Sequence, residues 1–230
     1  MTRRLLNLFT MLLFTVGAWA QIEEPRNILE IGINGGLNLS QMDIQPKIRQ
    51  NMLKGINSGV SIRYTSEKYF NMICGAQIEF NYSQRGWEED FDDDTGNSYS
   101  RTLNYLEVPL LAHLAFGKEP RGLQFFINLG PQIGFLISED EEYKGVWDIA
   151  SRPEGSQPIY GKDVENKFDY GIAGGAGLEL RTKIGNFTLE GRYYYGLGDI
   201  FGNSKTDDYG RSANTTITVR LGYSVTLFNK

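Results

Sequence analysis

The stretch "FTLEGRYYYGLGDIF", residues 187–201, alternates apolar and polar side chains with a period of two. Phe187 and Leu189 stand at odd positions, whereas Glu190 and Arg192 stand at even ones. This period predicts a β-strand with one apolar face and one charged face. In a soluble sheet the apolar face packs inward, but in a membrane barrel it faces lipid. The rest of the chain must decide between the two.

The same alternation recurs along the whole chain of 230 residues. Most of the alternating segments are long enough to cross a bilayer as tilted strands, and an even number of them is typical of bacterial outer-membrane barrels. The eight predicted strands are 28–39, 58–65, 70–85, 104–116, 123–135, 169–181, 187–201 and 214–228.

The predicted connections alternate between short and long. Tight turns at one end and long loops at the other are typical of an outer-membrane barrel, whereas a soluble sandwich rarely sorts its loops in this way. We therefore predict an all-β fold: an eight-stranded antiparallel up-and-down transmembrane β-barrel with a polar, plugged lumen. The short turns lie near 67 and at 117–122 and 182–186, and the long loops are 40–57, 86–100, 138–167 and 198–213.

The N-terminus has the layout of a secretory signal peptide. Arg3 and Arg4 precede an apolar run, and Ala18-Trp19-Ala20 forms a small-x-small cleavage site. The apolar run is too short for a membrane-spanning helix, which needs about 20 residues. We expect residues 1–20 to be the signal peptide, cleaved on export, and 21–230 to form one outer-membrane barrel domain.

Ten charged residues fall at inward positions of the predicted strands. Five carboxylates stand against five guanidinium groups, so the interior can form a neutral network. An ion or proton path would be a functional interpretation, but eight strands leave little room and favour a plugged structural core. The carboxylates are Glu30, Glu79, Glu107, Glu179 and Glu190, and the arginines are Arg63, Arg85, Arg181, Arg192 and Arg220.

One predicted loop, 86–100, is strongly acidic. Asp90, Asp92 and Asp94 alternate along it, and carboxylates at this density can bind Ca²⁺. The EF-hand spacing fails, however, because Gly96 comes one position late. A solvated acidic loop is the favoured interpretation, and we predict neither a metal site nor a cofactor.

The expected partners follow from charge, fold and the final strand. The formal net charge of −5 argues against nucleic acid. Lipid of the bacterial outer membrane must surround an integral barrel, and an unknown extracellular or envelope protein is expected as a further partner. Arg220, Gly222, Val225 and Leu227 have a spacing that resembles the assembly signal read by the barrel-assembly machinery.

The sequence leaves two rival classes of protein to consider. An outer-membrane enzyme, such as a lipid-modifying acyl hydrolase, generally uses histidine as a base, and the single histidine, His113, falls inside the lumen near the short turns. Base catalysis needs a substrate within reach, so we expect no enzyme. A soluble exported lipid-binding barrel would need the apolar face inside, and carbonate washing of membranes distinguishes it from an integral barrel.

Three segments carry a resemblance to a known family. "IGINGGLNLSQMD", "YLEVPLLAHLAF" and "GLQFFINLGPQIGFLI" are similar to the PorT-like outer-membrane β-barrel proteins of Bacteroidota, over about 28–228. The resemblance implies a barrel in the outer membrane and names no catalytic residue. The namesake of the family belongs to the type IX secretion and gliding machinery, which is an alternative role here. Its motifs do not separate the secretion components from other members.

The predicted topology makes accessibility differ between the two ends of the barrel. Epitope tags inserted at 90–97 or 150–157 should bind antibody on intact cells, because long loops face the exterior. A tag at 183–185 should be reached only after the outer membrane is permeabilised. Labelling of that turn on intact cells would contradict the orientation.

Overall fold

A computed structural model describes residues 24–89, 91, 96–119, 121–146, 148–152, 154–202 and 209–229. The expected signal peptide 1–20 lies outside these residues. So do Asp90, Asp92 and Asp94 of the acidic loop. No helix of the described residues is both long and apolar enough to cross a membrane.

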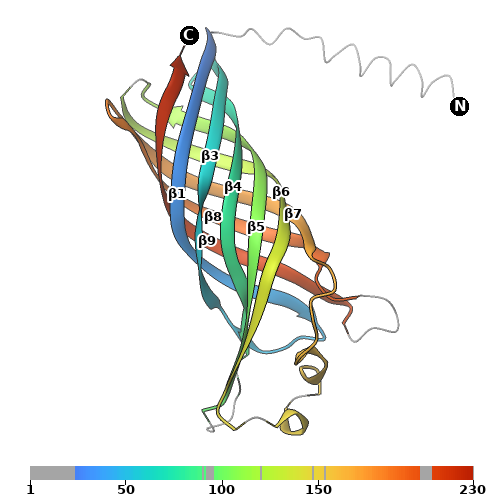
Figure 1. Ribbon diagram of the computed structural model, residues 1–230. Helices are drawn as coiled ribbons and strands as arrows, with labels where there is room; N and C mark the ends of the chain where they lie inside the picture. Colours follow the sequence, from blue (N-terminus) through green and yellow to red (C-terminus); the bar gives the residue numbers. More distant parts are fainter. Residues whose placement is uncertain are drawn as a thin grey trace, which may run out of the picture.

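Within the described residues, eight long antiparallel strands close into a ring (Figure 1). Each long strand pairs with its neighbours in the chain, and the ring closes where the first strand pairs with the last. A two-residue strand, β2 (Gln50–Asn51), adds to the end of β4. The long strands are β1 (Glu24–Gln45), β3 (Leu53–Tyr69), β4 (Met72–Glu89), β5 (Ser98–Gly117), β6 (Gly122–Lys144), β7 (Phe168–Thr182), β8 (Gly185–Asp199) and β9 (Arg211–Asn229).

The two ends of the barrel differ, as Figure 1 shows. The short-turn end carries the three tight connections, the start of β1 and the end of β9. The turn between β7 and β8 contains only Lys183 and Ile184, and Gly185 follows with a φ of 139°, which a residue with a Cβ rarely adopts. The long-loop end carries the other four connections. The predicted alternation of short and long connections is therefore confirmed.

The predicted strand limits were too short at the long-loop end. β5 has 20 residues and β6 has 23, whereas a crossing needs about 9–11. The segment expected to be the loop 40–57 is largely strand, since β1 continues to Gln45 and β3 starts at Leu53. Outside the bilayer these strands form the same ladder hydrogen bonds, but without lipid their outward side chains need not be apolar. The alternation of apolar and polar residues in the sequence therefore did not reveal how far the strands extend.

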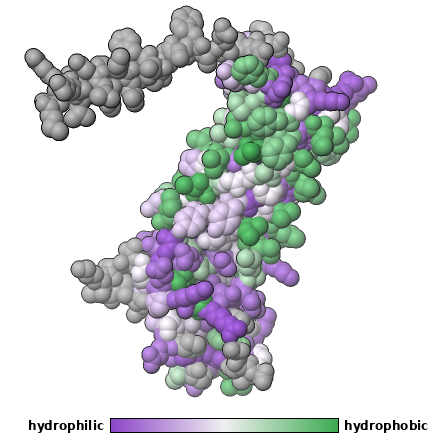
Figure 2. Space-filling view, turned by 180° about the vertical axis from the view of Figure 1, so that it is seen from behind, coloured by the Kyte–Doolittle hydropathy of each residue, from purple (hydrophilic) through white to green (hydrophobic). Residues whose placement is uncertain are grey.

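The outward face of the barrel is apolar over a broad band (Figure 2). Ile33 and Leu37 on β1 are 63% and 64% exposed, and Leu189 on β8 is 48% exposed. Polar surface replaces the apolar band toward the long-loop end (Figure 2). Exposed apolar side chains around a closed ring are what a lipid-facing wall requires. The opening stretch therefore points its apolar face outward.

The inward face is polar and closely packed. Glu190 and Arg192, on the same strand as Leu189, are buried. Small residues make room for the long side chains: a Cβ on Gly36 would lie 2.3 Å from the Val219 carbonyl oxygen and 2.6 Å from the Cβ of Arg220. Glycine at this position therefore leaves space for the Arg220 side chain to cross the lumen.

The outward exposure of Leu189 gives a test of the two faces. Leu189→Arg should impair insertion, because a cation on the lipid face costs up to about 2–4 kcal/mol near the bilayer midplane. Thr102→Arg is the control, since Thr102 lies on β5 beyond the apolar band and pairs with Asp140. The fraction of folded protein in lipid vesicles is the measurement. Equal losses for both variants would refute the assignment of the faces.

Candidate functional site

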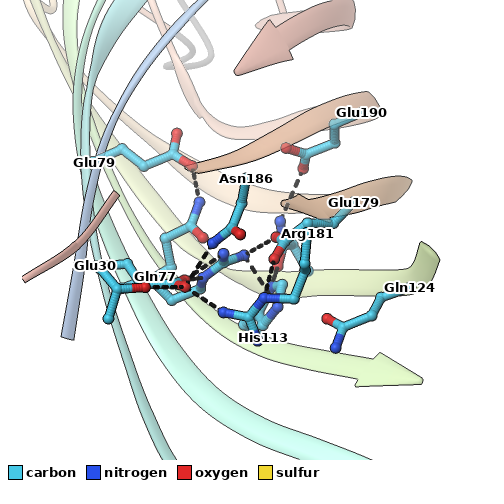
Figure 3. A network of polar contacts seen from close by, with 12 residues as sticks. Glu30, Gln77, Glu79, His113, Gln124, Glu179, Arg181, Asn186 and Glu190 are labelled. Atoms are coloured by element: carbon cyan, nitrogen blue, oxygen red, sulfur yellow. Dashed lines mark hydrogen bonds and ion pairs between the residues drawn. The ribbon is translucent and has the colours of Figure 1, made fainter. Parts of the chain in front are cut away.

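Four of the ten predicted lumen residues form a cluster toward the short-turn end. Arg63 pairs with Glu30 at 2.5 Å and with Glu179 at 2.6 Å. Arg181 also pairs with both carboxylates, at 3.3 Å from Nε to Glu179. Figure 3 shows Glu30 of β1 and Arg181 of β7 pointing toward one another. Each guanidinium here bridges two carboxylates, so the four charges balance.

His113 connects this cluster to the centre of the lumen (Figure 3). Arg63 donates to its Nε2 at 3.3 Å, so Nδ1 carries the proton and donates to Asn128 at 2.8 Å. Asn128 in turn donates to Glu190 at 3.1 Å. The ring is 3% exposed. Both nitrogens of His113 are therefore engaged in the network.

The central cluster contains Glu79, Glu190, Arg192 and Arg220. Arg220 donates to both oxygens of Glu79, at 2.7 Å and 2.6 Å, and to Glu190 at 2.9 Å and 2.6 Å. Arg192 also binds both carboxylates, with two bonds of 2.9 Å to Glu79 and one of 3.0 Å to Glu190. Paired arginines therefore bind paired carboxylates across the whole width of the barrel.

A third cluster lies nearer the long-loop end and adds a residue outside the ten. Arg85 pairs with Glu107 at 2.6 Å and with Asp169 at 3.1 Å. The Arg85 guanidinium also lies 4.1 Å from the ring centre of Tyr194 and 5.5 Å from that of Tyr105. Asp169 stands at an inward position of its predicted strand, so alternation could have identified it.

The register of the strands sets these pairs. Glu30 lies directly opposite Arg63 in the β1–β3 ladder, and Glu190 lies opposite Arg220 in the β8–β9 ladder. Opposite residues in neighbouring strands have Cβ atoms about 5 Å apart, close enough for side chains to pair. Pairs such as Arg85 with Asp169 cross the lumen instead, which a narrow barrel permits.

Little open space remains around the charges. A cavity of about 40 Å³ lies among the lumen side chains, bordered by Asn34, Arg63, Asn128 and Arg220. One water needs about 10–15 Å³ by this measure, so the cavity holds a few waters at most. It does not amount to a channel for solutes.

Between the charge clusters and the long-loop end, the interior becomes apolar. Trp87, Tyr99 and Leu103 on β4 and β5 are fully buried, and they pack with Ile159 and Phe201 from the long connections. Because this part of the wall lies beyond the apolar band, it meets water, and the apolar side chains turn inward. The sequence did not predict this core, because these residues fell largely in expected loops.

Arg101 secures the connection between β6 and β7 over this core. The connection contains two short helices, η1 (Ile149–Ser151) and η2 (Gln157–Ile159). Arg101 is 1% exposed and donates to the carbonyl oxygens of Ile159 at 3.3 Å and Lys162 at 2.6 Å. Its guanidinium also pairs with Glu139 and with Glu141, the latter at 3.0 Å. The connection is thus held closed over the mouth.

A second contact holds the same connection. The Tyr160 hydroxyl donates to Glu89 at 2.6 Å, and the Tyr160 ring stacks edge-on against Tyr99. Burial, together with the bond to the Glu89 carboxylate, raises the pKa of Tyr160 well above its usual range. The hydroxyl therefore keeps its proton, and can donate to Glu89, even at alkaline pH where an ordinary tyrosine ionises.

Part of the predicted acidic loop 86–100 is strand, since β4 continues to Glu89 and β5 begins at Ser98. Asp90, Asp92 and Asp94 lie outside the described residues. Within the part of the chain that the structure describes, no group of three or more histidine, cysteine, aspartate or glutamate side chains is arranged to hold a metal ion. The expectation that loop 86–100 is a solvated acidic loop without a metal site therefore stays a prediction.

A family model for the outer membrane protein beta-barrel domain matches residues 19–202. The chain belongs to this family. It is therefore an integral outer-membrane β-barrel protein, in agreement with its apolar wall and charged lumen. No curated protein matches the chain.

Solved structures of other outer-membrane barrels are similar in overall arrangement. OprG from Pseudomonas aeruginosa is 12% identical, over 89% of this chain and 99% of that one, with a TM-score of 0.46. Ail of Yersinia pestis is 16% identical, over 85% and 98%, with a TM-score of 0.37. The outer membrane enzyme PagL is 10% identical, over 85% and 98%, with a TM-score of 0.41. Likenesses at this level say nothing about the activity of this barrel.

The central cluster predicts a large effect of a single substitution. Arg220→Leu should lower the free energy of unfolding by about 3–5 kcal/mol, because Glu79 and Glu190 lose a buried partner. Unfolding of the refolded protein in detergent by heat or urea is the measurement. Arg26→Leu is the control: Arg26 pairs with Glu119 at 3.0 Å near the surface, where a pair contributes about 1 kcal/mol or less. A similar loss in both variants would contradict a stabilising role of the lumen network.

Proposed function

We propose that this barrel is a closed scaffold that presents an interaction surface to the cell exterior, and that it neither conducts solutes nor catalyses a reaction. The filled interior carries the proposal. Three clusters of paired charges follow one another along the lumen from the short-turn end toward the long-loop end, and an apolar core with Arg101 closes the long-loop end. A molecule entering from either side would have to break several buried pairs.

The position of the only histidine argues against catalysis. His113 is the single histidine of the chain. Arg63 and Asn128 occupy its two nitrogens, and the lumen around it is filled. A general base must reach the proton that it removes from a substrate. Neither lipid nor an extracellular substrate reaches this ring without unfolding the network.

The long-loop end supports a role in interaction. The outer parts of β5 and β6 extend beyond the apolar band and are paired there from Ser98 with Lys144 to Asn104 with Ser138. Asp140 and Glu142 on this extension are exposed, whereas Tyr99 and Arg101 on the opposite face are buried. A rigid, hydrogen-bonded sheet outside the membrane is suited to hold a constant surface toward a protein partner.

We infer further that the chain is a PorT-like protein of Bacteroidota, exported with cleavage of residues 1–20. The three quoted motifs support this assignment, the first of them lying on β1 and including Gly32 and Gly36 at inward positions. The barrel-assembly machinery is the proposed reader of the final strand, β9. A part in type IX secretion and gliding remains the alternative role within this assignment.

Planar-bilayer recording tests the closed state. The purified protein should show no steady conductance, because paired side chains fill a lumen whose width is set by strand number and shear. A general porin recorded in the same bilayers serves as the positive control. Stepwise, porin-like openings of the unmutated protein would overturn the proposal and favour transport.

A further inference from the structure

The charged side chains of the three lumen clusters do not balance. The cluster at the short-turn end pairs Arg63 and Arg181 with two carboxylates. The central cluster also pairs two arginines with two carboxylates. The third cluster sets one guanidinium, that of Arg85, against the carboxyl groups of Glu107 and Asp169. If both acids were ionised, this cluster would carry one excess negative charge.

Glu107 and Asp169 are held by the same guanidinium. Oε1 of Glu107 lies 2.6 Å from Nη2 of Arg85, and Oδ2 of Asp169 lies 3.1 Å from Nη1. The two acids come from β5 and β7, and they are 4% and 1% exposed. Two buried carboxylates that share one site repel each other, and such a pair keeps one proton.

One oxygen of the pair stands apart from the others. Gln132 donates to Oε2 of Glu107 at 3.0 Å, and Asn214 donates to Oδ2 of Asp169 at 3.1 Å. Together with the contacts to Arg85, three of the four carboxyl oxygens have a partner. Oδ1 of Asp169 is buried and makes no hydrogen bond to any residue that the structure describes. A proton on this oxygen disturbs none of the existing contacts.

The other groups that face the two carboxyls do not supply the missing positive charge. Among the described residues one further cation faces Glu107: Arg192, which is bound to both carboxylates of the central cluster. The remaining groups are neutral, since an ordinary tyrosine has a pKa of about 10. They are Ser83 on β4, Tyr105 on β5, Gln132 on β6, Tyr194 on β8 and Asn214 on β9.

The surroundings also keep solvent away from the pair. Toward the long-loop end the pair adjoins the apolar core, to which Tyr105 belongs. Trp87 and Leu103 of this core are 0% exposed. An excess carboxylate here would have neither a counter-ion nor bulk water. A buried acid in this situation takes up a proton, because an unpaired buried charge costs far more.

We propose that Glu107 and Asp169 bind one proton between them at neutral pH, and that Oδ1 of Asp169 holds it. Glu107 stays ionised and pairs with Arg85, while neutral Asp169 accepts hydrogen bonds through Oδ2. A metal cation fits less well, because it needs several oxygen ligands and one carboxyl oxygen is without a partner. The site goes beyond the scaffold role, since it makes the stability of the barrel depend on pH.

Unfolding of the refolded protein at different pH values tests the proposal. In the unfolded chain both carboxyls are ionised above about pH 5, so unfolding releases the bound proton and becomes more favourable as the pH rises. The unfolding equilibrium constant of the unmutated protein should rise about tenfold more per pH unit than that of Asp169→Asn, between about pH 5 and 7. Equal slopes for the two proteins would overturn the site.

Substitution by amides separates this pair from the balanced clusters. Asp169→Asn and Glu107→Gln should each leave the melting temperature at neutral pH nearly unchanged, because Arg85 keeps one counter-charge. Glu79→Gln is the matched control and should lower it by several degrees, since two arginines lose a shared carboxylate. Glu107→Gln/Asp169→Asn should lower it as well, because Arg85 is left unpaired. A loss in Asp169→Asn as large as in Glu79→Gln would contradict the proposal.

Infrared spectroscopy observes the proton directly and needs only the unmutated protein, so it decides the question even if a variant fails to fold. At neutral pH the spectrum should contain the carbonyl stretch of a protonated carboxyl group, and an isotope label on the aspartate carboxyl carbons should shift it. The band should be absent from Asp169→Asn. It should also be absent from Glu107→Gln, where Asp169 ionises to pair with Arg85. An unmutated protein without a label-sensitive band would refute the site.

Discussion

In the hydrocarbon of a bilayer no water is present to satisfy backbone N–H and C=O groups, so the strands must pair with each other around a closed ring. Eight strands make a ring whose interior is only wide enough for side chains. Everything polar that alternation places inside must therefore find its partner among other inward side chains. The arginine–carboxylate clusters follow from this constraint, because an unpaired charge in such a space is strongly destabilising.

The same strands obey a second rule outside the bilayer. Within the apolar band Leu189 faces outward and Arg192 faces inward, the reverse of a soluble protein. At the long-loop end Trp87 and Leu103 are buried and Asp140 is exposed, as in a soluble sheet. The change occurs because the medium around the wall changes from lipid to water.

Arg211, at the start of β9, joins β1 to β8 on the outer surface of this end. It pairs with Asp43 on β1 and also donates to the Tyr195 hydroxyl on β8. Side-chain contacts of this kind supplement the ladder hydrogen bonds between the same strands.

Alternation in the sequence by itself determined the eight-stranded barrel, the direction of each face and the inward location of the ten charged residues. It succeeded because lipid demands the same side-chain period along every strand. Only the tertiary structure decided which charges meet: Glu79 binds Arg192 and Arg220 from β8 and β9, far away in the chain. Such partners depend on register and strand tilt, which leave no local signal. The contacts of Arg101 and the apolar core at the mouth also could not be predicted from the sequence. Beyond the bilayer no lipid surrounds the strands, so their outward side chains need not be apolar.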